Sequence, residues 1–179
     1  MERGDELQKT RRELTREHFE AKYPHLWLVR ELEDDERAPS SFNTLAFDSR
    51  RTLAMGKKLR GKTPAGVLAR LRLDPGRYGL YAVTKTDANP WSDRIMVGRA
   101  SNNDVVFRHE SVSKVHAYFQ CGADGVWRLH DAKSANGTRV DGATVVASDG
   151  GIEVRGGSLV AFGSLSCEVV TSADLYDVL

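Results

Sequence analysis

Four short motifs in the second half of the sequence carry basic, hydroxyl and amide side chains that could form hydrogen bonds to a ligand. Arg99 offers a planar fork of hydrogen-bond donors that matches a phosphate group. Ser113 offers a hydroxyl and Lys114 a mobile ammonium group, and the Asn136 amide can both donate to and accept from a peptide backbone. These residue types together predict a compact phosphopeptide site. The motifs are, in chain order, Gly98-Arg99, Asn103-Asp104-Val105, Ser113-Lys114-Val115-His116 and Ser134-Ala135-Asn136-Gly137-Thr138.

The motifs lie at the ends of short β-favouring runs or in the loops between them. Turn signals such as Asp124-Gly125 and Asn136-Gly137 separate the runs, and apolar side chains alternate at Ile95 and Val97. Several short strands at this spacing predict a β-sandwich whose loops hold binding residues on a rigid scaffold. Ser172 is expected to cap a short closing helix. The predicted strands are Tyr78–Thr84, Arg94–Val97, Val115–Gln120, Val126–His130, Leu159–Phe162 and Ser166–Thr171.

Residues 1–75 have a different pattern of apolar and charged residues from the rest of the sequence. Apolar residues recur among charges three and four apart, which predicts one amphipathic helix from about Asp5 to Lys22, stopped by Pro24. Leu26–Val29 is an apolar run that fits either a strand or a docking segment. Thr63-Pro64 is expected to open a short helix that ends at Leu73. Further strand residues are available in Phe42, Leu45, Phe47 and Leu53, and the pattern leaves open whether this part is a docked cap or a mobile arm.

The stretch Ser49–Leu73 is basic and contains a motif that matches a phosphate-binding loop in sequence only. Eight Lys and Arg residues occur there without an acidic residue, which fits either a solvated surface or a docking patch for an anionic partner. Gly56–Thr63 matches the phosphate-loop string G-x-x-x-x-G-K-[ST], and a nucleotide-binding enzyme is therefore a remote alternative. Pro64 removes a backbone N–H that a bound phosphate would use, and about 75 residues are too few for the parallel sheet around such a loop.

Composition narrows the class of protein. The 179 residues suit one domain or one domain with an extension, and 26 Lys and Arg balance 25 Asp and Glu to a net charge of +1. That balance argues against a general nucleic-acid binder, and no apolar run approaches the length of a membrane span. Cys121 and Cys167 lack metal spacing and fit a reducing compartment, so we expect a cytoplasmic protein without metal or cofactor. Residues 1–75 carry a charge of +3 and residues 76–179 a charge of −2. Binding of an anion by the second half must therefore depend on a few well-placed side chains, Arg99 above all, rather than on overall charge.

The order of these motifs resembles that of the forkhead-associated (FHA) domain, as found in small single-FHA proteins of bacterial type. The resemblance covers about residues 78–172 and rests on Gly98-Arg99, Ser113-x-x-His116 and Asn136-Gly137-Thr138, supported by Asn103-Asp104 and the ending Gly156–Gly163. It implies a mainly β fold, a sandwich of two antiparallel sheets with about 11 strands, plus an N-terminal helical or mixed extension and a short C-terminal helix. The implied division is extension 1–75, FHA domain 76–172 and tail 173–179.

The resemblance also implies roles for individual residues. Arg99 would pair with the phosphate of a phosphothreonine, Ser113 would donate to it with help from Lys114, and Asn136 would hold the peptide backbone. Gly98, His116, Gly137 and Thr138 match positions with structural roles, and His116 would brace the binding loop. Ser111 and Arg108 lie on the approach loop and are expected to tune specificity. Ala135 stands where many members carry a hydroxyl, so one hydrogen bond to the ligand is expected to be missing.

The implied function is that of a non-catalytic adaptor. It would recruit a phosphothreonine-containing protein, such as a Ser/Thr kinase or a kinase substrate, in signal transduction. We expect the protein neither to bind specific nucleic acid nor to insert into a membrane. Its oligomeric state is left open. A second hypothesis is a degenerate FHA scaffold that binds protein independently of phosphate.

Overall fold

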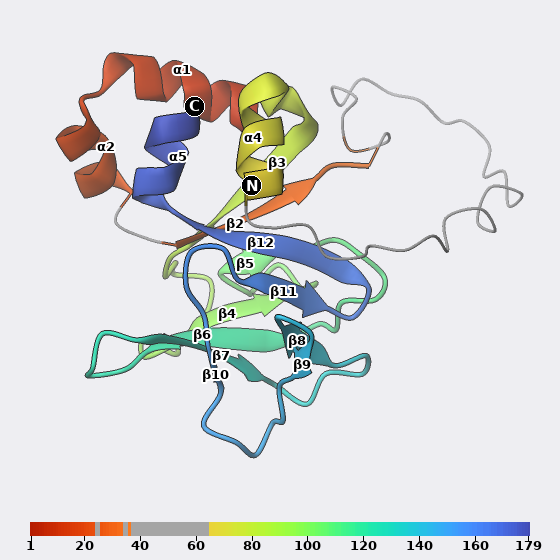
Figure 1. Ribbon diagram of the computed structural model, residues 1–179. Coiled ribbons are helices and arrows are strands. Elements are labelled where there is room, and N and C mark those ends of the chain that lie inside the picture. Colours follow the sequence, from red (N-terminus) through yellow and green to blue (C-terminus); the bar gives the residue numbers. More distant parts are fainter. Residues whose placement is uncertain (24–25, 34–35, 37–64) are drawn as a thin grey trace, which may run out of the picture.

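The computed structural model describes residues 1–23, 26–33, 36 and 65–179, and its strands from β3 (Tyr78–Val83) to β12 (Leu165–Thr171) follow one another without an intervening helix. Two β-sheets lie face to face, and helices from the described residues cover the outer face of the larger sheet (Figure 1). The mainly β, two-sheet architecture predicted from the sequence is confirmed. The predicted residues Phe42, Leu45, Phe47 and Leu53, the motif Gly56–Thr63 and most of the basic stretch lie outside the described residues.

The larger sheet has seven strands in the order β1-β3-β2-β12-β11-β8-β9, all antiparallel. The smaller sheet has five strands in the order β10-β7-β6-β4-β5, antiparallel except for the pair β4 and β5. The larger sheet comprises β1 (Glu2–Arg3), β3 (Tyr78–Val83), β2 (Leu26–Glu31), β12 (Leu165–Thr171), β11 (Leu159–Phe162), β8 (Thr138–Val140) and β9 (Ala143–Thr144). The smaller comprises β10 (Ile152–Glu153), β7 (Trp127–Asp131), β6 (Ala117–Cys121), β4 (Ile95–Gly98) and β5 (Val105–Val106).

Each of the six predicted strands is confirmed, and none of their ends shifts by more than two residues. The sequence did not reveal β1, β5, β8, β9 and β10, which are two or three residues long and so present almost no periodicity. Leu26–Val29 is a strand, β2, which pairs with both β3 and β12 in the middle of the larger sheet. The boundary predicted at residue 75 therefore separates β1 and β2 from the other strands of the same sheet.

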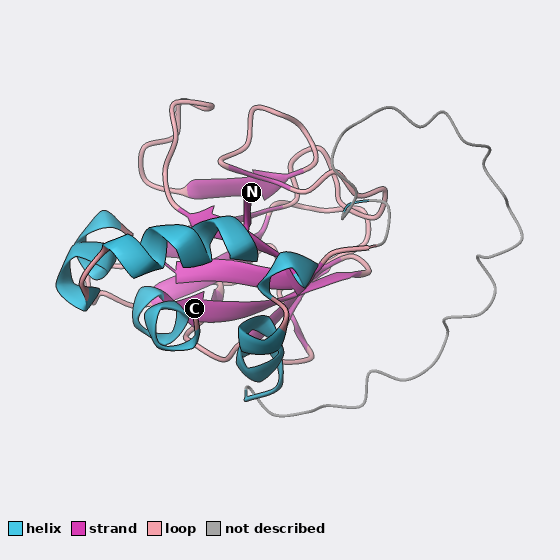
Figure 2. Cartoon of the chain, turned by 90° about the horizontal axis from the view of Figure 1, so that it is seen from above, coloured by secondary structure: helices cyan, strands magenta, loops and turns pink. Residues whose placement is uncertain are grey.

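Helices pack against the outer face of the larger sheet and form the helical cap. The cap consists of α1 (Gly4–Glu13), α2 (Arg16–Lys22), α4 (Ala65–Leu73) and α5 (Ser172–Val178), with the short 3-10 helix η1 (Pro75–Arg77) leading into β3. Seen from above, these helices lie across the strands (Figure 2). The sequence left open whether the N-terminal part is a docked cap or a mobile arm. The described residues of α1, α2 and α4 are docked on the larger sheet.

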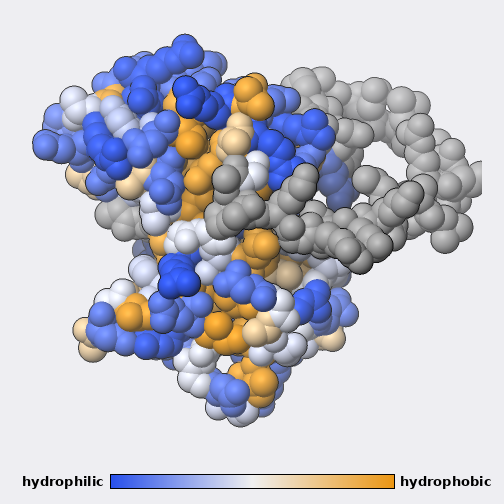
Figure 3. All heavy atoms as spheres, viewed as in Figure 1, coloured by the Kyte–Doolittle hydropathy of each residue, from blue (hydrophilic) through white to orange (hydrophobic). Residues whose placement is uncertain are grey.

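The sheet is apolar on both faces because it is covered on both. Leu28 and Val169 face the core between the two sheets, whereas Trp27, Val29 and Val170 face the helical cap. Leu7 of α1, Phe19 of α2 and Leu175 of α5 complete this second core. Figure 3 shows that the outward surface of α1 is hydrophilic, as expected for a helix with one buried face. The unbroken apolar run at residues 26–29 is thus typical of a strand buried on both faces.

Two sequence predictions about helix ends were wrong. The single helix expected from Asp5 to Lys22 is two helices, because Leu14 is extended and Thr15 caps α2 by accepting from the His18 backbone N–H. The cap of α5 is Thr171 rather than Ser172, since the Thr171 hydroxyl accepts from the Asp174 N–H at 3.1 Å. The Ser172 hydroxyl instead donates to the Tyr23 carbonyl and accepts from Trp27 Nε1 at 3.2 Å.

Candidate functional site

The sequence motifs meet at one end of the sandwich, where four loops are joined by hydrogen bonds. The Arg99 N–H, after β4, donates to the Ser113 carbonyl at 2.8 Å. The Ala135 N–H, after β7, donates to Ser113 Oγ at 3.0 Å. The Gly163 N–H, after β11, donates to the Gly137 carbonyl at 2.9 Å. Residues more than 60 positions apart in the chain thus form one surface, which we call the apical site.

Gly98 and Asn103 set the spacing between the first two loops. A Cβ at Gly98 would lie 2.4 Å from the Lys114 carbonyl oxygen and 2.9 Å from Asn103 Nδ2, so a side chain there would force the loops apart. The buried Asn103 amide donates to the carbonyls of Ala100 and Lys114, each at 2.7 Å. Glycine is therefore required at position 98 by the close approach of a backbone carbonyl.

Arg99 is anchored through one nitrogen and leaves its fork exposed. Its Nε donates to the Val112 carbonyl at 3.1 Å, and the side chain is exposed. Among the described residues, no hydrogen bond or ion pair involves its two terminal nitrogens. Because a guanidinium presents two parallel donors to an anion, this arrangement offers a fixed and unoccupied bidentate fork.

Ser113 is half-buried and already accepts one hydrogen bond, from Ala135. Its hydroxyl hydrogen has no acceptor among the described residues, so the oxygen is held in place while the donor stays available. Ala135 contributes a backbone N–H that Ser113 occupies, and its methyl group cannot replace the missing hydroxyl. The neighbouring Lys114 side chain is exposed and has no partner in the described part of the chain.

His116 braces the loop from below and is fully buried. Its Nδ1 accepts from the Ser113 N–H at 2.9 Å, which places the ring hydrogen on Nε2, 3.1 Å from the Gly137 carbonyl. The ring packs edge-on against Phe162. Burial lowers the pKa of His116, while the Gly137 carbonyl and nearby Asp131 oppose that shift. A neutral imidazole with a hydrogen bond at each nitrogen therefore connects the loops that carry Ser113 and Gly137.

Asn136 and Ser111 join the remaining loops. Asn136 is exposed, and its Nδ2 donates to the Ser111 carbonyl at 2.9 Å, which leaves Oδ1 without a partner among the described residues. Ser111 Oγ lies 2.9 Å from His109 Nδ1 and accepts from the Ser164 N–H at 3.1 Å. Gly137, with φ of +76°, lets the chain turn directly after Asn136. Ser111 thus supports the loop that orients Asn136.

Asp131, which the sequence analysis did not single out, holds the Asn136 loop from its base. Its carboxylate accepts from Ser134 Oγ and Thr138 Oγ1, each at 2.6 Å, and from the Ser134 N–H at 3.0 Å. Burial opposes ionisation, but these hydrogen bonds outweigh it and lower the pKa of Asp131. The signal in the sequence is an Asp at a predicted strand end with hydroxyl residues three and seven positions later.

A depression of about 450 Å³ adjoins the Arg99 fork. Arg99 and Arg108 supply two cations to its wall and Glu110 one carboxylate, and the remaining lining residues are Ser101 and His109. Arg108 is exposed and, within the described residues, unpaired. The apical site therefore combines a positively charged hollow with the hydroxyl of Ser113 and the amide of Asn136.

The described residues contain no cluster of three or more His, Cys, Asp or Glu side chains that could hold a metal ion. No helix in the described ranges is long and apolar enough to cross a membrane.

One comparison with known proteins, that with protein-family models, agrees with the motifs. Residues 95–163 match the family model of the FHA domain. No curated protein matches the sequence.

Among solved structures, the N-terminal FHA domain of Rad53p from S. cerevisiae with a phosphothreonine peptide is 19% identical, with 56% of this chain and 90% of that chain covered and a TM-score of 0.44. An FHA domain of an Arabidopsis thaliana hypothetical protein is 22% identical, with 54% and 75% covered and a TM-score of 0.42. Mycobacterium tuberculosis EmbR with a low-affinity phosphopeptide is 19% identical, and the alignment covers 44% of this chain, only 20% of EmbR, with a TM-score of 0.39.

Proposed function

We propose, because residues 95–163 match the family model of the FHA domain, that the apical site binds phosphothreonine peptides. Such binding would make the protein an adaptor rather than an enzyme. The observation that carries the proposal is a pair of open donors on two loops that the hydrogen bond from the Arg99 N–H to the Ser113 carbonyl joins. The Arg99 fork and the Ser113 hydroxyl each have a fixed position and lack an acceptor within the described residues.

A phosphate dianion supplies the acceptors that these groups lack. It carries about −1.5 to −2 charges at neutral pH and three oxygens that accept hydrogen bonds. Each charge-assisted hydrogen bond contributes roughly 1.5 to 3 kcal/mol, so two such bonds separate a phosphorylated peptide from its plain form by at least about a hundredfold in affinity. Lys114, exposed beside Ser113, adds to the attraction. Binding would thus be conditional on a kinase having acted.

Asn136 supports recognition of the peptide backbone around the phosphate. Its Oδ1, which has no partner among the residues that the structure describes, can accept from a backbone N–H, while its Nδ2 stays on the Ser111 carbonyl and keeps the amide oriented. Because the contact is with backbone atoms, it tolerates many partner sequences. We therefore infer a partner class, a protein phosphorylated on threonine by a Ser/Thr kinase, with sequence preference left to the hollow beside Arg99 and Arg108.

Calorimetry on the full chain tests the proposal. The titrants are one peptide with phosphothreonine, the same peptide with phosphoserine, and the unphosphorylated peptide, drawn from a phosphothreonine library screened on the protein. We expect only the phosphothreonine form to bind tightly, and we expect Arg99→Ala to weaken it by tenfold or more. Arg12→Ala is the matched control, because Arg12 is an exposed arginine on α1 within the helical cap.

Two outcomes would contradict the proposal. Equal binding of the phosphorylated and plain peptides would favour a degenerate scaffold, as would retained partner capture by a chain carrying both Arg99→Ala and Asn136→Ala. Binding of ATP that is lost in Lys62→Ala would favour the nucleotide-binding alternative.

A further inference from the structure

Arg108 comes to the same surface as Arg99 because strands β4 and β5 run parallel. The two strands pair with Gly98 opposite Val106, and the Phe107 N–H donates to the Gly98 carbonyl at 3.0 Å. Paired strands that run parallel end on the same side of the sheet, so the residues that follow them emerge together. Arg99 and Arg108 accordingly line one hollow of about 450 Å³.

The loop that carries Arg108 is anchored on both sides of this residue. The Phe107 side chain is 1% exposed, and its ring packs against Tyr81 with 4.4 Å between the ring centroids. On the other side, His109 Nδ1 accepts from the Ser111 N–H at 3.2 Å. The Arg108 side chain itself is exposed and has no hydrogen bond or ion pair with any described residue. Its guanidinium is therefore carried by a fixed backbone, with its donors available to a ligand.

The apical loops hold more positive charge than one phosphate group balances. Residues 99–104, 107–116 and 132–137 connect the strands at this end of the sandwich, and Glu110 is their one exposed carboxylate. Their exposed cations are Arg99, Arg108, Lys114 and Lys133. A phosphate dianion adds about −1.5 to −2 charges, so about one positive charge remains when the phosphate and Glu110 are both counted. This surplus leaves room for one more anion.

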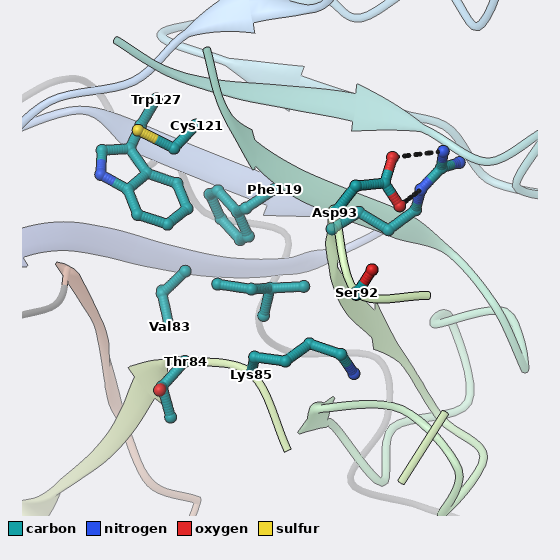
Figure 4. A pocket seen from close by; sticks show the side chains of 10 residues that line it. Val83, Thr84, Lys85, Ser92, Asp93, Phe119, Cys121 and Trp127 are labelled. Carbon is teal, nitrogen blue, oxygen red and sulfur yellow. Dashed lines mark hydrogen bonds and ion pairs between the residues drawn. The ribbon is translucent and has the colours of Figure 1, made fainter. Parts of the chain in front are cut away.

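Cations at the opposite end of β4 are paired. Lys85 and Arg94 line a depression there, together with Ile95, the first residue of the strand. Lys85 Nζ donates to Asp104 at 2.8 Å, and Arg94 donates to Asp93 through two nitrogens, at 2.8 and 3.0 Å. Figure 4 shows the second of these ion pairs as dashed lines at Asp93. The two arginines of the apical hollow form no ion pair within the described residues, which leaves that hollow open to an anion from another molecule.

We propose that the hollow beside Arg108, which we call the second-anion subsite, binds a negatively charged side chain near the phosphothreonine in the same partner segment. This inference rests on the proposed function, because it assumes that the Arg99 fork holds the phosphate of that phosphothreonine. The Arg108 guanidinium can form two parallel hydrogen bonds to a carboxylate or to a second phosphate group. The partner is thereby narrowed to threonine-phosphorylated segments that are acidic or are phosphorylated a second time.

Glu110 makes the sign of the accepted charge measurable. It lines the same hollow, and its exposed carboxylate has no ion pair among the described residues. This carboxylate repels an anion bound there, whereas it would attract a cation. Glu110→Gln should therefore strengthen the binding of a segment with a second anion and weaken the binding of a segment with a lysine at the same place.

A scan of peptides on the full chain tests the inference. The parent peptide carries phosphothreonine among alanine and glycine residues, and each of the four positions on either side is replaced in turn by Asp, Glu, phosphoserine or Lys. Calorimetry gives the ratio of each affinity to that of the parent. We expect at least one position at which an anion raises the affinity about threefold or more. A gain with Asp and Glu would identify carboxylates as sufficient, and a gain with phosphoserine alone would identify a second phosphate.

Variants at exposed positions assign the gain to Arg108. The ratio should fall to about one in Arg108→Ala and rise in Glu110→Gln, and it should stay as in the natural chain in Arg12→Ala, again the matched control. Circular dichroism would verify that each variant is folded. The inference would be overturned by no gain at any position, by a gain with Lys instead of an anion, or by a gain that persists in Arg108→Ala.

The parent peptide separates this inference from the proposed function. If the parent binds and Arg99→Ala weakens it, while no anion adds affinity, only the second-anion subsite is rejected. If the parent does not bind, or binds equally well to Arg99→Ala, the proposed function fails and the subsite fails with it.

Discussion

The Ser113 hydroxyl oxygen and the Ala135 backbone N–H are joined by a 3.0 Å hydrogen bond, although 22 positions separate the two residues. This bond fixes the hydroxyl that would donate to a phosphate, and it ties the loop before β6 to the loop after β7. His116 makes a second bridge between the same loops, from the Ser113 N–H to the Gly137 carbonyl. The apical site is therefore held as one unit before any ligand arrives.

Ser113→Ala should weaken phosphothreonine-peptide binding by about 10- to 100-fold, which corresponds to the 1.5 to 3 kcal/mol of one charge-assisted hydrogen bond. The change removes the donor to the phosphate and the acceptor for the Ala135 N–H. Calorimetry with the same phosphopeptide would measure it. Ser166→Ala, at an exposed position of β12, is the control. Unchanged affinity in Ser113→Ala would remove Ser113 from the binding site.

Acidification should destabilise the protein through His116. Its pKa is lowered in the folded state by burial, so the contribution of the neutral ring is complete above the ordinary histidine pKa of about 6.5. That contribution is lost as the pH falls through the lowered folded-state pKa, because a proton on Nδ1 would confront the Ser113 N–H. Urea unfolding between pH 5 and pH 7.5 would measure the slope.

The matched variant for this pH dependence is His116→Phe, which keeps a ring against Phe162 but cannot titrate. It should be less stable than the natural chain at pH 7.5, since the Ser113 N–H and the Gly137 carbonyl lose their partner. Its stability should vary less with pH, with a remaining slope from His130, whose pKa is also lowered by burial. An equal slope in both proteins would show that His116 is not responsible.

Asp104→Asn should lower the free energy of unfolding by about 3 kcal/mol, since it breaks a buried network. The fully buried carboxylate accepts from Lys85 Nζ at 2.8 Å and from the Met96 N–H and Asn89 Nδ2, each at 2.7 Å. Burial opposes ionisation, but these donors outweigh it and lower the pKa of Asp104. Urea denaturation would measure the loss. Asp93→Asn, on the surface, should cost much less, because an exposed ion pair contributes little. A similarly small loss for Asp104→Asn would contradict the prediction.

Glu168→Gln should stabilise the protein increasingly as the pH rises. The Glu168 side chain is 3% exposed, and its Oε1 has no hydrogen bond to any described residue. Burial raises its pKa to about 7, opposed by Arg70 and reinforced by Asp174. The raised pKa contributes stability below the unfolded-state value of 4.5, and that contribution is lost as the pH rises through about 7.

The gain from Glu168→Gln should therefore be small near pH 4 and reach on the order of 3 kcal/mol at pH 8.5. Thermal unfolding at both pH values would measure it, with the exposed Glu153→Gln as control. A gain that does not change with pH would assign the effect to packing rather than to the charge.

The sequence by itself determined the strands with clear alternation and the identity of the apical residues. Alternation depends only on neighbours in the chain, and Asn136-Gly137 specifies its own turn. The apical residues Arg99, Ser113 and Asn136 were identified because the order of their motifs in the chain resembles that of FHA domains. Local patterns missed the break at Leu14, where Thr15 caps a second helix. They also placed the cap of α5 at Ser172, one residue after the hydroxyl of Thr171 that forms it.

Only the tertiary structure decided which side chains support the site and what the N-terminal part does. The partners of Asp104 come from up to 19 positions away, and the Ser113 hydroxyl meets an N–H from another loop. The docking of β2 between β3 and β12 depends on an apolar surface built from three distant segments. No local pattern encodes such contacts, since burial and hydrogen-bond satisfaction are fixed only when the sheets and the helical cap come together.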